Sequence, residues 1–260
     1  QMCIRDRKLT IKEIGDITGG QPVGDPSALV TGVSIDSRSI DKNQLFVPIK
    51  AKRNGHDFVS DAIRNGATGH LFSEGKAQGN AVKVNDTLIA LQDLAKFERK
   101  RITGDVIGVT GSVGKTTTKD ILFASLRNLT EVHVSKLSFN NELGLPLTIL
   151  SAETSTKHLI LEMGARGPGQ IAELAKIAHP TLGIVTRVAS AHTEFFQDID
   201  HIAETKGALV ELLPSSGTAI LNNDDPRVAE MSKRTNAEIV TYGLEAVSYT
   251  HLTLPTKRNV

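Results

Sequence analysis

Asp105-Val-Ile-Gly-Val-Thr-Gly-Ser-Val-Gly-Lys-Thr-Thr-Thr118 is the stretch that decides the fold of this chain. Its apolar start, residues 106–109, predicts a buried strand, and residues 116–129 have helical spacing. A glycine-containing loop followed by Lys-Thr joins the two, which is the layout of a phosphate-binding loop. The spacing departs from the common G-x-x-x-x-G-K-[ST] form because Val109 stands where the first glycine belongs, and an ordinary glycine turn is the alternative.

The residues of this loop indicate what it would bind. Gly111 and Gly114 lack the Cβ atoms that would hold an anion away, so backbone N–H groups can close around phosphate oxygens. Lys115 would reach the β and γ phosphates of a nucleotide, and Thr116 would offer its hydroxyl to Mg2+. The loop residues expected to contact the nucleotide are Gly111, Ser112, Val113, Gly114, Lys115, Thr116 and Thr117.

Composition limits the class of protein. The chain has 260 residues, a net charge of +1 and one cysteine. That length suffices for two modest domains with buried cores, and charge spread without runs argues against nucleic acid as a partner. No apolar stretch approaches the roughly 18 residues of a membrane span, so membrane insertion is not expected. A single cysteine excludes an internal disulfide and fits a reducing cytoplasm, which is the expected location.

Residues 8–86 are predicted to form a small α/β domain without a phosphate loop. Thr10, with Glu13 three residues later, is a capping-box pattern for its first helix. The ends of the chain, residues 1–7 and 247–260, match nothing around them and are interpreted as non-native. Helices are expected at residues 9–17 and 57–65, and strands at residues 29–35, 44–49, 70–72 and 81–84.

Residues 87–246 are predicted to form a second domain around the phosphate loop. An amphipathic helix at residues 87–101 would join the two domains. Strands and helices then alternate, which predicts a mainly parallel sheet covered on both faces, with ligands beyond the carboxyl ends of its strands. The strands are expected at residues 106–109, 131–134, 158–162, 183–186, 218–221 and 239–242, and the helices at residues 116–129, 144–150, 169–178, 199–213 and 227–234.

Several polar residues in the second half of the chain are candidates for ligand chemistry. Asn140 and Asn141 follow the second strand of this sheet, although they can equally form a capped turn. Glu162 ends a strand and is a natural Mg2+ ligand, or a carboxylate in water. His192 follows the next strand and Lys206 lies in a helix; alone, they would be a structural histidine and a solvated lysine.

Together, these motifs resemble the Mur ligase family over residues 8–245. Within the family they are closest to the branch that joins D-alanyl-D-alanine to UDP-N-acetylmuramoyl-tripeptide, particularly in its actinobacterial form. The segments that carry the resemblance in the second half are Gly111 to Thr117, Asn140-Asn141 with Gly144-Leu-Pro146, Leu161-Glu-Met-Gly-Ala165, Ala191-His192 and Thr205-Lys206-Gly207. Those in the first half are Val33-Ser-Ile-Asp-Ser-Arg38, Leu45-Phe-Val-Pro-Ile49 and Asn54-Gly-His-Asp-Phe58. The segment Asn222-Asn-Asp-Asp-Pro226 also resembles a family segment, but no role is assigned to it.

The resemblance implies an ATP-dependent amide ligase that works through an acyl phosphate. It implies ATP and two Mg2+ ions as cofactors, with Lys115 on the γ-phosphate and a carbamylated Lys206. The catalytic residues would be Lys115, His192 and Lys206; the metal ligands Thr116, Glu162, His192 and Lys206; and Asn140 and Asn141 would join the nucleotide site. The uridine nucleotide of the substrate would contact Ser34, Asp36, Ser37, Arg38, Asn54 and His56.

Other functions remain open on the sequence. A Mur ligase that adds a diamino acid, or a folylpolyglutamate synthetase, would share the phosphate loop, Glu162 and Lys206. A nucleotide-binding regulatory protein would use the loop without ligation. The family's later adenine-contacting motif and its third domain have no counterpart here, so the chain is expected to be a truncated monomer that binds ligands without completing the reaction.

Overall fold

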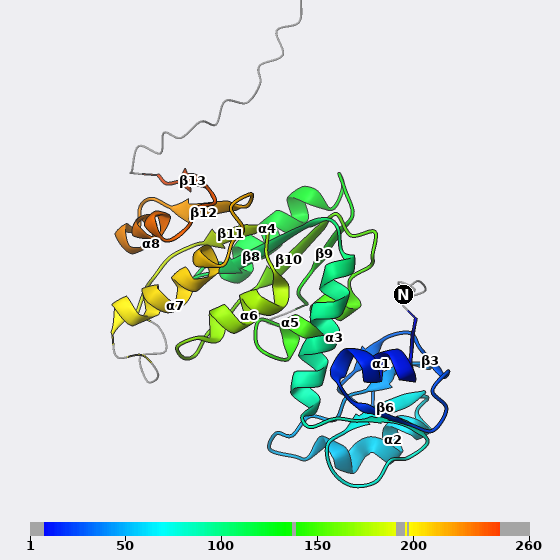
Figure 1. Cartoon of the computed structure of the whole chain (residues 1–260). Helices are drawn as coiled ribbons and strands as arrows, with labels where there is room; N and C mark the ends of the chain where they lie inside the picture. The colour runs from blue at the N-terminus through cyan, green and yellow to red at the C-terminus, as the bar shows by residue number, and fades with distance from the viewer. Residues whose placement is uncertain (1–7, 137–138, 191–195, 197, 245–260) are drawn as a thin grey trace, which may run out of the picture.

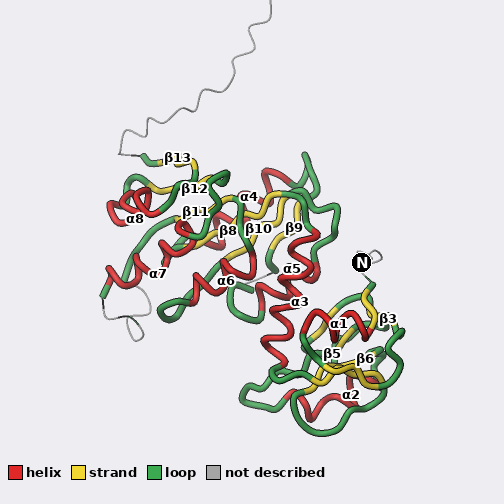
Figure 2. The backbone as a smooth tube through the Cα atoms, viewed as in Figure 1, coloured by secondary structure: helices red, strands yellow, loops and turns green. Residues whose placement is uncertain are grey.

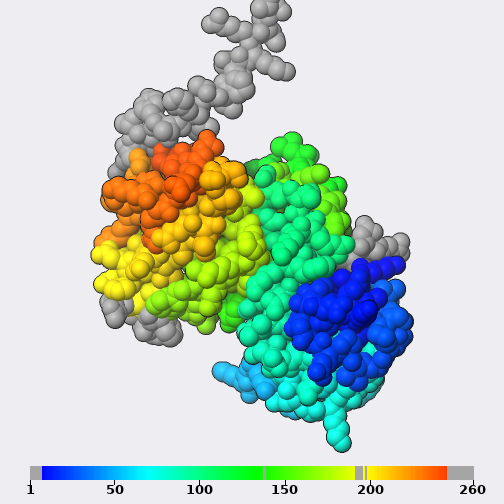
Figure 3. Space-filling model, in the orientation of Figure 1, coloured from blue at the N-terminus to red at the C-terminus, as the bar shows by residue number. Residues whose placement is uncertain are grey.

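The computed structural model describes residues 8–136, 139–190, 196 and 198–244, which form two lobes (Figure 1). Each lobe is built on its own sheet, and the tube view shows the strands of the two sheets well separated in space (Figure 2). In the space-filling view the N-terminal lobe, blue to cyan, lies against the green part of the second lobe (Figure 3). This is the predicted α/β architecture with a smaller N-terminal part and a larger part that carries the phosphate loop.

The larger sheet has six strands in the order β13-β12-β11-β8-β10-β9. Every neighbouring pair in it is parallel, as the alternation of strands and helices predicts. The strand with the phosphate loop, β8, lies in the middle, which places its carboxyl end beside those of β10 and β11. The strands are β8 (Asp105–Thr110), β9 (Val132–Val134), β10 (His158–Glu162), β11 (Leu182–Val185), β12 (Thr218–Asn222) and β13 (Glu238–Tyr242).

Helices cover both faces of this sheet because successive side chains of a strand point to opposite faces. Ile107 and Val109 pack with residues of α4 (Lys115–Leu126). Val106, which precedes Ile107 and points to the opposite face, belongs instead to a core that includes residues of α5, α6 and α7. These helices are α5 (Gly144–Ser151), α6 (Gln170–Ala178) and α7 (Ile199–Glu211), and α8 (Pro226–Glu230) follows β12. The predicted helix at residues 227–234 is shorter than expected, because residues Met231–Arg234 form a 3-10 turn.

The smaller sheet has five strands in the order β2-β7-β6-β5-β4. All its pairs are parallel except that of β2 with β7. The edge strand β2 was not predicted because it contains Pro22, which lacks an N–H and is tolerated only where no ladder bond is needed. The strands are β2 (Gln21–Val23), β4 (Val33–Ser34), β5 (Leu45–Phe46), β6 (Gly69–Phe72) and β7 (Asn80–Lys83).

One predicted strand of the N-terminal lobe is divided. Residues 29–35 contain β3 (Leu29–Val30), which pairs antiparallel with β1 (Leu9–Thr10), and then β4, which pairs with β5. The chain turns between them because Thr31 N donates to Asn43 O, 2.7 Å away, instead of continuing either ladder. The helix predicted at residues 57–65 likewise begins as a 3-10 turn, Gly55–Phe58, before α2 (Val59–Arg64).

The first helix, α1 (Ile11–Thr18), begins two residues later than expected because Leu9 and Thr10 form β1, but Thr10 caps it as the sequence predicts. Glu13 N donates to Thr10 Oγ1 at 3.1 Å, and Thr10 N donates back to Glu13 Oε2 at 2.7 Å. The predicted capping box is therefore confirmed. It satisfies two backbone donors that a helix start would otherwise leave without a partner.

Helix α3 (Thr87–Arg101) joins the lobes. It packs against α1 of the first lobe and against α5 and α6 of the second, so one continuous apolar core crosses the junction. The buried Arg99 strengthens this contact: its guanidinium donates to Ala178 O at 2.6 Å and His179 O at 2.9 Å, at the end of α6. The division at residue 87 stays a prediction. Among the described residues no helix is long and apolar enough to cross a membrane.

Candidate functional site

The phosphate loop runs from β8 to α4 and depends on two glycines. Gly111 and Gly114 have φ angles of +149° and +85°, which favour glycine. A Cβ on Gly111 would overlap with Thr186 Oγ1, so this position also needs glycine for close approach. Gly114 directly precedes the first residue of α4, which aims the amino end of that helix at the loop.

Lys115 lies folded back over its own loop. Its Nζ donates to Gly111 O at 2.9 Å and to Ser112 O at 3.4 Å. Burial lowers the pKa of Lys115, and the nearby carboxylate of Glu162 opposes that change. The ammonium is therefore held within the loop that the sequence predicts for phosphate.

Glu162 brings the predicted metal ligands together at the carboxyl end of β10. Thr116 Oγ1 donates to Glu162 Oε2 at 2.9 Å, and Asn140 Nδ2 donates to Glu162 Oε1 at 2.8 Å. Glu162 is only 1% exposed, so its charge is compensated by these bonds and by the loop lysine rather than by water. Asn141 has a different contact: its Oδ1 accepts from Gly144 N at 2.9 Å, which supports the start of α5.

Lys206 lies on α7 and is 5% exposed, so it is not the solvated lysine that its position in a helix would suggest by itself. Burial lowers the pKa of Lys206 to about 8, and the Lys115 ammonium acts in the same direction. Its Nζ has no hydrogen-bond or ion-pair partner among residues 8–136, 139–190, 196 and 198–244. A buried amine without a partner is costly, so this position favours either the neutral amine or an added anionic group.

A cavity of about 640 Å³ connects these groups. Predicted residues in its wall are Gly111, Ser112, Lys115, Asn140, Asn141 and Lys206. Glu162 lies next to the wall because it accepts a hydrogen bond from Asn140, and Thr116 in turn donates to Glu162. The other predicted loop residues, Val113, Gly114 and Thr117, are not in the wall. His192 lies outside the described residues. The wall also contains residues that the sequence analysis did not assign to the site, although Gly164 and Ala165 belong to a segment that carries the family resemblance: Glu142, Gly164, Ala165, Arg166, Gly167, Gln170, Phe196 and Ile202.

The side-chain oxygens beside the phosphate loop fit a hard cation better than a soft one. No group of three or more His, Cys, Asp or Glu side chains that could hold a metal is present among the described residues. The oxygens of Thr116 and Glu162, by contrast, lie 2.9 Å apart beside the loop. Mg2+ is held in proteins by one or two such oxygens, with phosphate and water supplying the rest. The residues present therefore fit one Mg2+ ion bound together with a nucleotide.

The N-terminal lobe has a second cavity, of about 660 Å³. Its wall includes the predicted residues Asp36, Ser37 and Arg38, and also Arg53 and Arg64, which were missed. Arg38 Nη2 lies 2.7 Å from Asp36 Oδ2, and these hydrogen bonds lower the pKa of Asp36 to about 2. The wall also contains Asp61, whose Oδ1 lies 3.1 Å from Arg64 Nη1, so the three arginines exceed the two carboxylates by one. The cavity thus offers hydrogen-bond acceptors and a small excess of positive charge, which suits an anionic ligand.

The other three predicted substrate residues lie apart from this cavity. Asn54 and His56 line a separate cavity of about 310 Å³. Both ring nitrogens of His56 are engaged, Nδ1 with Asn54 Oδ1 at 2.9 Å and Nε2 with Ser73 N at 3.1 Å, and burial lowers its pKa. Ser34 Oγ donates to Asp36 O at 3.1 Å. These side chains support the loops around the second cavity.

Comparison with known proteins gives the family. The family model described as "Mur ligase middle domain" matches residues 109–258, and "Mur ligase family, catalytic domain" matches residues 29–99. A UDP-N-acetylmuramoyl-tripeptide–D-alanyl-D-alanine ligase from Mycobacterium tuberculosis is 38% identical over 265 residues, covering 90% of this chain and 52% of that protein.

Solved structures agree. MurF from Acinetobacter baumannii superposes with a TM-score of 0.86 at 26% identity, covering 91% of this chain and 54% of that one. MurF ligase from Thermotoga maritima in complex with ADP gives a TM-score of 0.76 at 35% identity, covering 83% and 51%. The chain spans about half the length of the curated relatives it matches. The phosphate loop and Lys206 share one cavity, and the middle-domain model matches more than half of the chain, so this chain belongs to the Mur ligase family.

Proposed function

We propose that this chain is part of an ATP-dependent ligase that joins D-alanyl-D-alanine to UDP-N-acetylmuramoyl-tripeptide in the cytoplasm. The observation that carries the proposal is the contact of Thr116 and Asn140 with the buried Glu162, directly beside Lys115. A regulatory nucleotide switch would not need the second cavity with its arginines. The relatives' names favour this branch over one that adds a diamino acid.

The proposed reaction has two balanced steps. A carboxylate oxygen of the tripeptide forms a bond to the γ-phosphorus of ATP while the bond to the ADP oxygen breaks. The amine of D-alanyl-D-alanine then forms a C–N bond at that carbonyl, phosphate leaves with the C–O bond, and the amine loses a proton. The first step is needed because a carboxylate has no good leaving group.

In the first step this chain would neutralise and orient the transferring group. Lys115 Nζ, now 2.9 Å from Gly111 O, would exchange its carbonyl partners for β- and γ-phosphate oxygens. The N–H groups at the start of α4 would bind the β-phosphate. Mg2+ supplies charge neutralisation between the phosphates when bound, and Thr116 and Glu162 would hold it.

Lys206 is proposed to act as a carbamate. An ammonium cannot bind a cation. The carbamate that forms when the neutral amine bonds to the carbon of CO2 and releases a proton has two oxygens that can. A pKa of about 8 leaves more neutral amine near neutral pH than an exposed lysine has. With His192, which lies outside the described residues, it would hold a second Mg2+ near the acyl phosphate.

The N-terminal lobe is proposed to hold the UDP part of the substrate. Asp36 and Ser37 offer acceptors and a hydroxyl to the uracil or ribose, and Arg38, Arg53 and Arg64 offer charge to the pyrophosphate. Ser34, Asn54 and His56 would act by holding the surrounding loops.

Ligand-induced thermal stabilisation tests the proposal on this chain. ADP with Mg2+ and UDP-N-acetylmuramoyl-tripeptide should each raise the melting temperature, because each binds only the folded state. The matched variants Lys115→Ala and Arg38→Ala should each lose one response and keep the other. Stabilisation by ADP with none by the UDP-sugar would favour the regulatory switch, and loss of both responses in one variant would show general damage.

A further inference from the structure

The segment 186–189, which follows β11, is tied to the phosphate loop by four hydrogen bonds. Thr186 Oγ1 donates to Val113 O at 2.6 Å, and Ser112 N donates to Arg187 O at 2.6 Å. Ser112 Oγ donates to Ala189 O at 2.9 Å and accepts from Ala189 N at 3.0 Å. The conformation of the loop therefore depends on where this segment lies.

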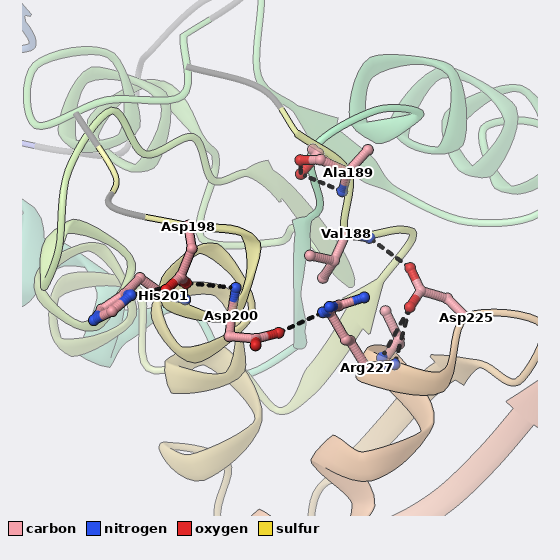
Figure 4. Close-up of polar contacts among 9 residues, drawn as sticks. Val188, Ala189, Asp198, Asp200, His201, Asp225 and Arg227 are labelled. Carbon is pink, nitrogen blue, oxygen red and sulfur yellow. Dashed lines mark hydrogen bonds and ion pairs between the residues drawn. The ribbon is translucent and has the colours of Figure 1, made fainter. Parts of the chain in front are cut away.

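The other side of the segment contacts Asp225, in the motif to which sequence analysis assigned no role. Figure 4 shows its carboxylate between Val188 and the first turn of α8. Oδ2 accepts from Val188 N at 2.8 Å, while Oδ1 accepts from Arg227 N at 3.0 Å and Val228 N at 3.4 Å. Asp225 is 7% exposed, so these are buried bonds to a charged acceptor, the stronger kind.

We propose that Asp225 is a positioning residue for the phosphate loop and acts through Val188, Ala189 and Ser112. The carboxylate fixes Val188, the neighbouring Ala189 binds both polar functions of the Ser112 side chain, and Ser112 lies in the wall of the nucleotide cavity. This inference rests on the proposed function only for the statement that the loop binds a nucleotide.

A second residue of the motif 222–226 also holds the segment 186–189 in place. Asn222 Nδ2 donates to Thr186 O at 2.8 Å, so residues 222–225 hold the segment at two points. A third contact, Arg227 Nε with Asp200 Oδ1 at 2.6 Å, is also visible in Figure 4. It matters less because its side chains are 42% and 75% exposed, and water screens such a pair.

Asp225 differs from an ordinary helix cap in what its second oxygen does. Asp86 caps α3 with Oδ1 alone, accepting from Leu88 N at 2.7 Å and Ile89 N at 3.1 Å. Asp225 also uses one oxygen for its own helix, but the other reaches a different element. The two functions can therefore be separated by substitution.

Asp225→Asn separates them. The asparagine keeps an oxygen for the cap, at which Asn is as good as Asp, but places an N–H2 group against Val188 N–H. Asp86→Asn is the matched control, because it makes the same change at a cap that touches no part of segment 186–189. Asp225→Ser, which also keeps one capping oxygen, serves if the asparagine variant does not fold.

Amide hydrogen exchange of the whole chain without ligand is the first measurement. In Asp225→Asn we expect exchange at Ser112 and Ala189 to be about tenfold or more faster than in the parent, through local opening. Asp86→Asn should leave both unchanged. Faster exchange at Val188 with unchanged exchange at Ser112 would overturn the proposal, because Asp225 would then be a local cap.

Titration with ADP and Mg2+ is the second measurement. Affinity should fall about tenfold in Asp225→Asn and stay within about twofold of the parent in Asp86→Asn, because a displaced loop loses charge-assisted bonds to phosphate. Equal affinity in parent and Asp225→Asn would also overturn the proposal. A parent that binds no ADP would instead refute the proposed function, while the exchange measurement would still decide whether Asp225 positions the loop.

Discussion

Replacing Lys206 by methionine should stabilise the fold, although Lys206 is proposed to act in the reaction. The lysine is 5% exposed, and burial followed by the Lys115 ammonium lowers its pKa from 10.5 to about 8. At about 1.4 kcal/mol for each pH unit, that difference corresponds to about 3 kcal/mol of unfolding free energy. Methionine has a similar length and no charge, so it removes this cost with little change in packing.

The sign of the pH dependence follows from the two protonation states. Below pH 8 the Lys206 amine is protonated in both the folded and the unfolded chain, and the folded chain bears the full cost of burying the charge. Between about pH 8 and 10.5 the unfolded chain keeps a proton that the folded chain has lost, so the parent becomes more stable as pH rises. The advantage of Lys206→Met should therefore be about 3 kcal/mol at pH 7 and vanish near pH 10.5.

Urea unfolding from pH 7 to 10.5 in CO2-free buffer measures this difference. Lys12→Met is the matched control, because Lys12 is exposed on α1. A stability difference that does not change with pH, or a Lys206→Met chain that is less stable throughout, would refute the argument from burial. Repeating the series with bicarbonate tests the carbamate, which should stabilise the parent and not the variant.

Three further predictions concern the two cavities. Gly111→Ala should weaken ADP binding about tenfold or more because its Cβ would overlap with Thr186 Oγ1; isothermal titration measures the affinity, and an unchanged value would contradict this reason for the glycine. In the full-length enzyme, Lys115→Ala should lower the ligation rate about a hundredfold or more while the melting temperature stays near that of the parent; a rate above a tenth of the parent's would remove Lys115 from the mechanism. Arg38→Ala should raise the Michaelis constant for UDP-N-acetylmuramoyl-tripeptide with little change in turnover, because its contacts are remote from the reacting carboxylate, and unchanged kinetics would place the UDP site elsewhere.

The larger sheet was predictable because its strands carry their own signal. Strands such as β8 and β10 are buried on both faces and read as short apolar runs between turn residues. The smaller sheet carries a weaker signal, since several of its strands have only two or three residues and one contains Pro22. Its boundaries depend on tertiary contacts such as that of Thr31 with Asn43, which no local pattern contains.

The site shows the same division between local and tertiary information. The phosphate loop and Glu162 were predictable because parallel strands end at one edge of a sheet. The contacts of Asp225 with Val188 and of Ser112 with Ala189 were not, because they join residues 37 and 77 positions apart through backbone atoms. Arg53, in a loop, and Arg64, at the end of α2, were missed for a related reason: arginines look like solvated surface until the fold gathers them around one cavity.

Some charged side chains of the site, unlike Lys206, already have hydrogen-bond partners among the residues that the structure describes. A ligand stabilises most a buried group that has no such partner. Glu162 already accepts from Thr116 and Asn140, and Lys115 already donates to its loop, so phosphate and Mg2+ would exchange existing bonds for stronger ones. Lys206 is different, since its side chain is largely buried and its Nζ has no hydrogen-bond or ion-pair partner within the described part of the chain. A bond formed there would displace no contact among the described residues and would relieve the cost of burial. The amine of Lys206 is therefore the group in this cavity whose chemistry a bound anion or an added carboxylate would change most.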